Sequence, residues 1–293
     1  METSFWDVPA LHSAVFSALI LFVLTAAVFI WFTVIYIKKK GFGSPEDTDL
    51  YIDCAYFQEV GKRPSQQDSV FISPLGEYKR YGITALVADG MGGMEYGGEI
   101  SEKIARFVEQ MCPLSFFATE QNADELRRFS NVLYDEYNLS GGSTLAMVHI
   151  TGNYMNYYSV GDSDIILIRD GVPTILNPRQ NYMALLIKSL CRNNKQTQSA
   201  YNNPKARALV DFMGNKNPRV IYTKKPIRIF DGDMIIVSSD GLTDAVALRN
   251  IPHYVKDSAG STALELKRAV AARKRPKQDN YTGIVFTAKR SLL

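Results

Sequence analysis

The stretch Gly82-Ile-Thr-Ala-Leu-Val-Ala-Asp-Gly-Met-Gly-Gly93 is an apolar run that ends in an aspartate followed by glycines. The run Gly82–Ala88 predicts a β-strand, because short apolar segments bounded by turn residues are typical of strands. Asp89 then stands at the end of this strand, where its carboxylate reaches a cleft while the strand packs in the core. Since a carboxylate is costly to bury without a partner, this position suggests a site rather than a core residue. Gly90 permits a tight turn and the close approach of a ligand to the backbone.

The same pattern occurs at four other places in the chain. The five aspartates at the ends of apolar runs are Asp68, Asp89, Asp162, Asp240 and Asp279. Any one of them alone is more often a turn or cap residue than a ligand. Carboxylates that converge on one point repel each other unless a cation lies among them, and hard oxygen ligands favour Mg²⁺ or Mn²⁺. The set of five therefore predicts a metal site built from oxygen ligands.

The order of the remaining patterns favours an α+β fold. Further strands are predicted at Tyr51–Glu59, Ser69–Ser73, Thr144–Thr151, Tyr154–Val160, Ile165–Arg169, Asp233–Ser239 and Tyr281–Thr287. Helical patterns occur at Gly98–Met111, Ala123–Tyr137, Leu248–Lys256 and Thr262–Arg273. Two antiparallel sheets with helices packed outside them satisfy this order. Turn signals at Thr151-Gly152-Asn153 and Asp170-Gly171 suggest hairpins.

The segment 177–217 is polar and is interrupted by prolines, with one apolar patch at Tyr182–Leu190. It is interpreted as a mobile insertion between strands. Long loops on a rigid scaffold often contact substrate.

The N-terminal part of the chain has the pattern of a membrane anchor. Residues Val8–Ile37 contain no Asp, Glu, Lys or Arg, and the run is long enough to span a bilayer as a helix. A cleavable signal peptide would need a basic segment before the apolar run, and residues 1–10 have none. Because Lys38, Lys39 and Lys40 follow the run, the C-terminal side is placed in the cytoplasm. The predicted parts are an outside tail at 1–12, a transmembrane helix at 13–37, a linker at 38–49 and a catalytic domain at 50–293.

Composition excludes several other classes of protein. The net charge is only +3, from 33 Lys and Arg against 30 Asp and Glu, which argues against a nucleic-acid binder. The three cysteines and three histidines are scattered, so a disulfide scaffold and a His/Cys zinc site are both disfavoured.

Six motifs in order resemble the metal-dependent protein phosphatase 2C family in its bacterial form. The matching stretches are Arg63-Pro-Ser-Gln-Gln-Asp-Ser69, Val87-Ala-Asp-Gly-Met-Gly-Gly93, Gly141-Gly-Ser-Thr144, Val160-Gly-Asp-Ser163, Ser239-Asp-Gly-Leu-Thr-Asp244 and Asp279-Asn-Tyr-Thr282. One such motif alone is weak, whereas six in the family's order are specific. The resemblance implies a four-layer αββα sandwich and the hydrolysis of phosphoserine and phosphothreonine in proteins. It also implies two ions of Mn²⁺ or Mg²⁺, or three, with a bridging hydroxide as the nucleophile.

The resemblance also implies a role for each matching residue. Asp89 would bind both ions, and the carbonyl of Gly90 would bind one of them. Asp240 and Asp279 would hold the other ion, and Asp68 would hold or orient metal-bound water. Asp162, together with Asp240, matches the position that binds a third ion in bacterial members. Arg63 would grip the substrate phosphate, for which a guanidinium fork is well suited.

Two departures from the family's pattern keep a second hypothesis open. Gln67 replaces the usual acidic residue, and Asp164 replaces the arginine of the common Gly-Asp-Ser-Arg. The alternative is a weak or inactive relative that binds phosphoproteins as a regulator. Under the first hypothesis the partners are phosphoprotein substrates, an opposing Ser/Thr kinase in signalling, and the lipid bilayer through residues 13–37. The basic run 267–277 is either a solvated helix face or a patch that attracts phosphoprotein or anionic lipid.

Overall fold

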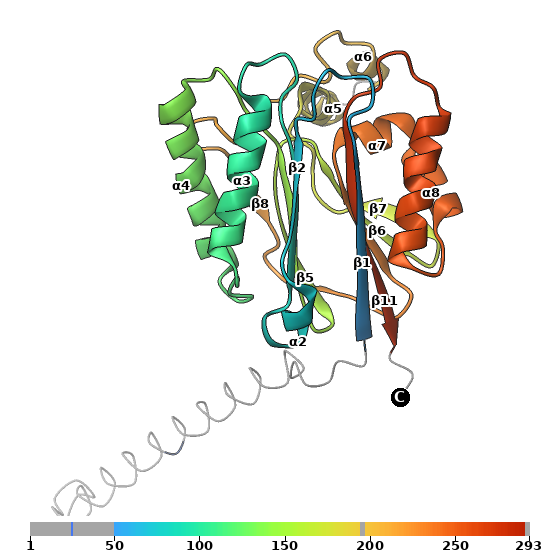
Figure 1. Cartoon of the computed structure of the whole chain (residues 1–293). Helices are drawn as coiled ribbons and strands as arrows, with labels where there is room; N and C mark the ends of the chain where they lie inside the picture. The colour runs from blue at the N-terminus through green and yellow to red at the C-terminus, as the bar shows by residue number, and fades with distance from the viewer. Residues whose placement is uncertain (1–24, 26–49, 194–196, 291–293) are drawn as a thin grey trace, which may run out of the picture. The chain divides into compact units, whose positions relative to one another are not determined.

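The strands of this chain pair into two antiparallel sheets with helices on their outer faces (Figure 1). The computed structural model describes Thr25 and residues 50–193 and 197–290. One sheet has the strand order β1-β11-β10-β6-β7, and the other has the order β2-β3-β4-β5-β8, with β9 paired to β5. The strands are β1 (Leu50–Glu59), β2 (Asp68–Ile72), β3 (Ile83–Asp89), β4 (Leu145–Thr151), β5 (Tyr154–Val160), β6 (Asp164–Arg169), β7 (Val172–Ile175), β8 (Ile221–Tyr222), β9 (Ile227–Arg228), β10 (Met234–Ser238) and β11 (Tyr281–Arg290).

Four of the described helices flank the paired sheets, two on each side. Helices α3 (Gly97–Met111) and α4 (Thr119–Tyr137) pack on the sheet that contains β3. Helices α7 (Asp240–Ala245) and α8 (Ala259–Ala272), with the 3₁₀ segment η3 (Leu248–Tyr254), pack on the sheet that contains β10. The short η2 (Leu75–Glu77) and α2 (Tyr78–Tyr81) join β2 to β3.

Strand β3 shows why its sequence is almost entirely apolar, with Thr84 as the one polar residue before Asp89. Ile83, Ala85 and Val87 point into the core between the two sheets. Leu86 and Ala88, on the opposite face, pack against α3 and α4. Successive strand residues face opposite sides, so a strand covered on both sides needs apolar residues throughout. Full burial of each large aliphatic side chain contributes about 1.5–3 kcal/mol.

Strand β10 has the same arrangement in the other sheet. Ile235 and Val237 face the core between the sheets, while Met234 and Ile236 face α7 and α8. The molecule therefore has the order helices, sheet, sheet, helices. This confirms the predicted α+β sandwich of four layers.

Both predicted hairpins are present. Gly152 and Asn153 join β4 to β5, and Asp170 and Gly171 join β6 to β7. Asp170 and Gly171 both have positive φ, at 52° and 74°, as the preferred two-residue hairpin turn requires.

Two predicted segments differ in the structure. The insertion lies between β7 and β8 as expected, but it is not an irregular loop throughout, because it contains α5 (Tyr182–Arg192) and α6 (Gln198–Tyr201). The side chain of Asn181 caps α5 by accepting a hydrogen bond from the backbone N–H of Ala184 at 3.0 Å. The predicted helix Leu248–Lys256 is a 3₁₀ segment instead, with Pro252 inside it.

The predicted membrane helix lies outside the residues that the structure describes, except for Thr25, as do the tail 1–12 and the linker 38–49. Among the described residues, none of the helices has the length and apolar character needed to cross a membrane. By its contacts the chain divides between Asp47 and Thr48, and the second unit contains both sheets.

Candidate active site

The five predicted aspartates come together because the strands are antiparallel. Asp68 begins β2 and Asp89 ends β3, at the same end of one sheet. Asp240 follows β10, and Asp279 precedes β11, at one end of the other sheet. Asp162 lies in the turn that carries the chain from β5, in the first sheet, to β6 in the second. One end of the sandwich, with α5 and α6 above it in Figure 1, therefore collects all five carboxylates.

Asp68 and Asp89 are direct partners across the β2–β3 pair. Like charges directly opposite each other in a sheet destabilise it. Asp68 is only 4% exposed. Its Oδ2 accepts a hydrogen bond from Ser239 Oγ at 2.9 Å, while its buried Oδ1 has no hydrogen-bond partner. This orphaned oxygen and the facing carboxylate fit a bound cation.

The backbone around Asp89 and Gly90 is held firmly. The N–H of Asp89 donates to Thr144 Oγ1 at 3.0 Å, and the N–H of Gly90 donates to the carbonyl of Gln67 at 3.0 Å. A Cβ at Gly90 would lie 2.5 Å from the carbonyl oxygen of Gly97. Only glycine fits this position, so the local backbone path depends on it.

Asp162 contacts the insertion between β7 and β8. It is 8% exposed, and its Oδ2 accepts a hydrogen bond from Asn181 Nδ2 at 3.1 Å. The preceding Gly161 has φ of 96° and lies against Thr144, so the turn that presents Asp162 requires a glycine. The residue that caps α5 therefore also holds this carboxylate in place.

Arg63 lies on the other side of the site, in the loop between β1 and β2. Its Nη2 donates to Asp279 Oδ2 at 2.6 Å, and both side chains are about two-fifths exposed, at 41% and 44%. This hydrogen bond, together with the nearby charges of Asp279, Asp89 and Asp240, raises the pKa of Arg63. A permanent cation thus stands beside the cluster of carboxylates.

The electrostatics show that the aspartates act on one another. Burial raises the pKa of Asp89 well above its usual range. The negative charge of each of the other four carboxylates raises this pKa further. Burial and the charge of Asp162 raise the pKa of Asp240 to about 8. Burial raises the pKa of Asp68 to about 6 and also raises that of Asp162. Ionising the whole cluster near neutral pH is costly without a compensating positive charge.

The donor set consists of hard oxygen atoms, which suits Mg²⁺ or Mn²⁺. As the side chains stand, no three or more His, Cys, Asp or Glu within the described ranges are already arranged around one ion position. The fit therefore rests on the convergence of the five carboxylates, their mutual repulsion and the orphaned oxygen of Asp68.

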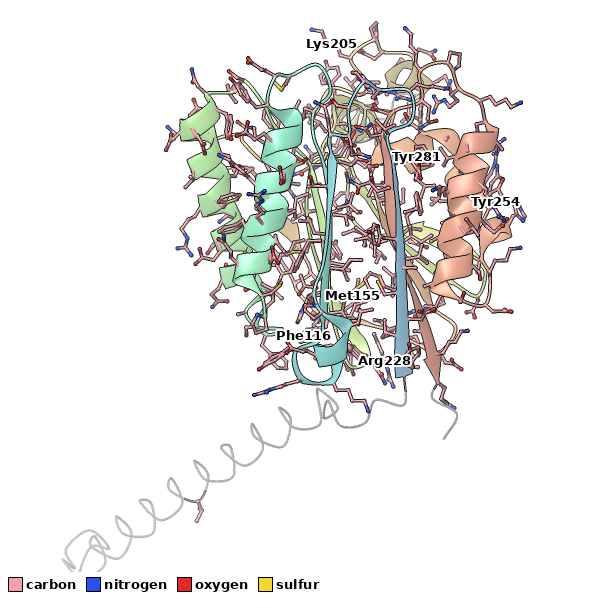
Figure 2. The ribbon with its side chains drawn as sticks, in the orientation of Figure 1. Phe116, Met155, Lys205, Arg228, Tyr254 and Tyr281 are labelled. Carbon is pink, nitrogen blue, oxygen red and sulfur yellow. The ribbon has the colours of Figure 1, made fainter. Side chains whose placement is uncertain are left out.

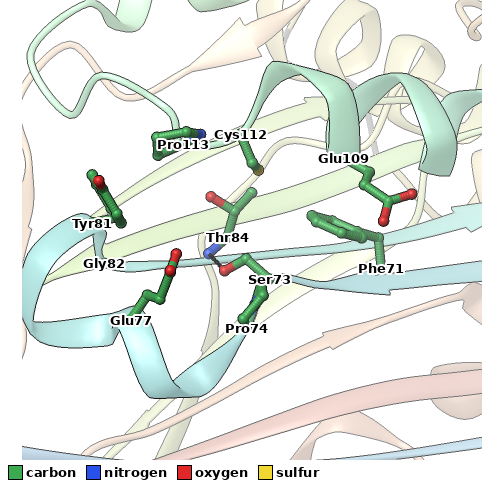
Figure 3. A pocket seen from close by; sticks show the side chains of 10 residues that line it. All are labelled: Phe71, Ser73, Pro74, Glu77, Tyr81, Gly82, Thr84, Glu109, Cys112 and Pro113. Carbon is green, nitrogen blue, oxygen red and sulfur yellow. Dashed lines mark hydrogen bonds between the residues drawn. The ribbon is translucent and has the colours of Figure 1, made fainter.

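A pocket of about 250 Å³ lies elsewhere, beyond the C-terminal end of β2 (Figure 3). Its lining includes Cys112, Glu109, Thr84 and Tyr81, and none of the predicted site residues. Burial raises the pKa of the Cys112 thiol, which disfavours a reactive thiolate there. The predicted site and this pocket are separate features of the molecule.

The sequence model for "Protein phosphatase 2C" matches residues 62–272. The chain belongs to the protein phosphatase 2C family. Members of this family are metal-dependent serine/threonine phosphatases that use Mn²⁺ or Mg²⁺.

Relatives and solved structures agree with this assignment. A "Putative protein phosphatase 2C-type" of Streptococcus pyogenes is 26% identical over 64% of this chain and 76% of its own length. "Probable protein phosphatase 2C 71" of Oryza sativa is 25% identical over 59% of this chain, which spans about a third (32%) of that relative. The catalytic domain of the phosphatase PstP in complex with two manganese ions superposes with a TM-score of 0.64 at 20% identity, over 82% of this chain and 99% of that one. That likeness shows that the fold is shared.

The sequence did not predict the partner of Asp164. Asp164 is fully buried and pairs with Arg179, whose Nε donates to Asp164 Oδ1 at 2.8 Å and whose Nη2 contacts Oδ2. Thr243 Oγ1 also donates to Asp164 Oδ2 at 2.8 Å. The carboxylate of Asp164 is thus paired with the guanidinium of Arg179, which comes from the insertion between β7 and β8. The unusual acid was the signal that a cation had to lie nearby.

A second ion pair joins the same elements. Arg207, from the insertion, pairs with Asp244 in α7. Both pairs connect the segment 177–217 to the end of the sandwich that carries the aspartates. Only the three-dimensional structure reveals them, because their partners are 15 and 37 positions apart in the sequence.

Proposed function

We propose that this chain is a membrane-anchored protein phosphatase that hydrolyses phosphoserine and phosphothreonine with bound Mn²⁺ or Mg²⁺. The observation that carries the proposal is the convergence of five carboxylates beside one arginine, with the pKa values of Asp68, Asp89, Asp162 and Asp240 raised. The ligands for two or three ions would be Asp68, Asp89, the carbonyl of Gly90, Asp162, Asp240 and Asp279. When bound, such ions lower the pKa of a water molecule, so that hydroxide is available near neutral pH.

The chain's own residues bind and orient the substrate. The guanidinium of Arg63 offers a planar pair of donors that matches two phosphate oxygens. Its ion pair with Asp279 is exposed, and exposed pairs contribute only about 0–1 kcal/mol. Arg63 can therefore exchange this carboxylate for a phosphate at little cost. Ser239 and the N–H of Gln67 support the loop around Asp68 through hydrogen bonds to Asp68 and Asn280.

The anchor and the orientation rest on the sequence alone. Residues 13–37 are long and apolar enough to span a bilayer, and three lysines follow them. This pattern supports a short N-terminal tail outside and a catalytic domain in the cytoplasm. The substrates would then be cytoplasmic phosphoproteins, and a Ser/Thr kinase would act in opposition to this enzyme.

The test uses the full chain, purified in a mild detergent, and a phosphothreonine peptide. Phosphate release is measured with EDTA, Mg²⁺ or Mn²⁺, for the wild type, Asp89→Asn and the exposed control Asp170→Asn. We expect release with Mn²⁺ or Mg²⁺ in the wild type and the control, and little release with EDTA or in Asp89→Asn. A folded wild-type chain that binds the peptide without releasing phosphate would instead support the regulator hypothesis.

A further inference from the structure

Two loops meet beside the candidate active site. The loop 60–67, between β1 and β2, carries Arg63, and the loop 273–280 connects α8 to β11. The N–H of Lys62 donates to the carbonyl of Gln278 at 2.8 Å, and Asn280 Nδ2 donates to the carbonyl of Val60 at 2.8 Å. Figure 1 shows both loops at the end of the sandwich nearest α5 and α6.

The loop 273–280 is also fixed to the element that carries Asp240. Gln278 is buried, and its Nε2 donates to the carbonyl of Gly241 at 3.2 Å. Gly61 approaches the backbone of Asp279 so closely that a Cβ would lie 2.2 Å from its carbonyl oxygen. The backbone of this loop therefore has a defined position relative to Asp240, Asp279 and Arg63.

Five cationic side chains lie on these two loops besides Arg63. We call them the cationic rim: Lys62, Arg273, Lys274, Arg275 and Lys277. Arg275 is half-buried and the other four are exposed. Within the described part of the chain, none of the five makes an ion pair, whereas the nearby Lys267 pairs with Glu59 and Arg268 pairs with Glu265. The positive charges of Lys267 and Arg268 in α8 are thus balanced by ion pairs, whereas those of the cationic rim are not.

We propose that the cationic rim binds acidic side chains that flank the phosphorylated residue of the substrate. This inference rests on the proposed function, because it assigns a substrate class to the same site. Lys62 is adjacent to Arg63, and an extended peptide advances about 3.3 Å per residue. With a phosphate at Arg63, carboxylates a few positions away along the peptide reach the rim. Uncompensated charges beside a cleft also speed the encounter with an anionic partner.

An anionic membrane surface is the other source of negative charge. The place of the rim within the domain favours the peptide. Strand β1 has ten residues, so it separates Leu50, where the described domain begins, from the rim by about 30 Å. The rim therefore lies at the opposite end of the domain from Leu50, and beside the residues that would bind a phosphopeptide.

The experiment measures kcat/KM of the full chain, in detergent with Mn²⁺, for two phosphothreonine peptides that differ only in flanking Glu or flanking Lys. The test variant is Arg273→Ala/Lys274→Ala/Lys277→Ala. The control variant Lys224→Ala/Lys225→Ala/Lys289→Ala removes the same charge from exposed positions away from the rim. The readout is the ratio of kcat/KM between the two peptides, so that a general change in activity cancels.

We expect the wild type to prefer the Glu peptide by about tenfold, since three exposed charge contacts at about 0.5 kcal/mol each amount to that factor. The test variant should reduce this ratio to about twofold or less, and the control should keep it. In the wild type, 0.5 M NaCl should lower the ratio, since salt screens exposed charges.

Three results would overturn the inference while leaving the proposed function in place. They are an equal rate for both peptides in the wild type, an unchanged ratio in the test variant, and an equal loss in the control. Hydrolysis of p-nitrophenyl phosphate shows in each case that the enzyme is active. Loss of binding to phosphatidylserine vesicles in the test variant, with an unchanged peptide ratio, would assign the rim to lipid. If neither p-nitrophenyl phosphate nor any peptide is hydrolysed with Mn²⁺, the proposed function itself fails, and the inference fails with it.

Discussion

Asp68 and Asp89 face each other across a pair of neighbouring strands, and Asp68 has one oxygen without a hydrogen-bond partner. Removing either charge from a metal-free protein relieves repulsion, whereas removing a ligand from a loaded enzyme removes function. The same substitution should therefore have opposite effects on stability and on turnover.

The variant Asp89→Asn tests this at the scale of one residue. In EDTA its melting temperature should rise above that of the wild type, by about 2–4 °C for each kcal/mol of repulsion relieved. With Mn²⁺ its turnover should fall by orders of magnitude, and its melting temperature should rise less on addition of Mn²⁺ than that of the wild type. Differential scanning fluorimetry and phosphate release measure both effects, with Asp170→Asn as the control. Near-normal turnover would contradict the role of Asp89.

The variant Arg63→Ala tests the phosphate contact. Its KM for a phosphothreonine peptide should rise about tenfold or more, since a charge-assisted bidentate contact is lost. Its kcat should fall less. Arg63→Lys should restore only part of the affinity, because an ammonium lacks the planar fork. Steady-state kinetics with all three proteins decides the matter, and a KM that does not change in Arg63→Ala would show that Arg63 has another role.

The positions of the five aspartates could be predicted from sequence, because each follows or precedes an apolar run that forms a strand. The partner of Asp164 could not, since Arg179 lies in a segment with no periodic pattern and reaches Asp164 only through the fold. The sequence also could not predict that Oδ1 of Asp68 has no hydrogen-bond partner, because this depends on where Ser239 packs.

At the scale of elements, the segment 177–217 is held to the sandwich by buried and exposed ion pairs. Arg179 reaches the fully buried Asp164, and Arg207 reaches Asp244. Asn181 both caps α5 and binds Asp162. The sequence showed an apolar patch here but too few periodic residues to indicate a helix over Tyr182–Arg192, because the cap and the ion pairs supply part of its stabilisation.

The variant Arg179→Ala should lower the free energy of unfolding by about 3–5 kcal/mol, because it leaves the carboxylate of Asp164 buried without its cation. The double variant Asp164→Asn/Arg179→Gln should be more stable than Arg179→Ala, since it removes both charges. Urea unfolding measures the differences, and Arg192→Ala, an exposed position on α5, is the control. If Arg179→Ala is as stable as Arg192→Ala, the ion pair does not hold the insertion.

At the scale of the whole molecule, three layers of core hold the domain together, and the sequence indicated them well. Strands such as Ile83–Asp89 and Met234–Ser238 are apolar on both faces because each lies between a helical layer and the other sheet. The order of strands within each sheet was not predictable, because β11, the last strand, pairs between β1 and β10. Such long-range pairing leaves no local signal in the sequence.

His149 couples this core to pH. It is 2% exposed in β4, where Thr84 Oγ1 lies 2.9 Å from Nδ1 and Thr151 Oγ1 lies 3.1 Å from Nε2. Burial lowers the pKa of His149 from 6.5 to about 4. Between these two pH values the unfolded chain binds a proton that the folded chain does not, so stability falls as the pH decreases through this window. The full effect is about 3 kcal/mol, from a difference of about 2.5 pKa units.

The variant His149→Gln should lose this dependence between pH 6.5 and 4. Asp68 and Asp240 act in the opposite direction, because their raised pKa values make the folded chain bind more protons as the pH falls. The measurement is therefore the difference between the unfolding free energies of wild type and variant at each pH, in which the carboxylates cancel. Parallel curves for the two proteins would show that His149 is not the source.

The predicted anchor should be separable from the folded domain. The unit Thr48–Leu293 contains all five aspartates, Arg63 and the three clusters of core residues. The first described strand of that unit begins at Leu50. The full chain should therefore sediment with membranes after cell lysis, whereas residues 41–293 should stay in the supernatant. The shortened chain should keep the kcat/KM that the full chain has in detergent, because every residue of the candidate site lies within the unit Thr48–Leu293. Sedimentation of the shortened chain with membranes would show a second membrane contact within the domain. A full chain that stays in the supernatant would contradict the anchor itself.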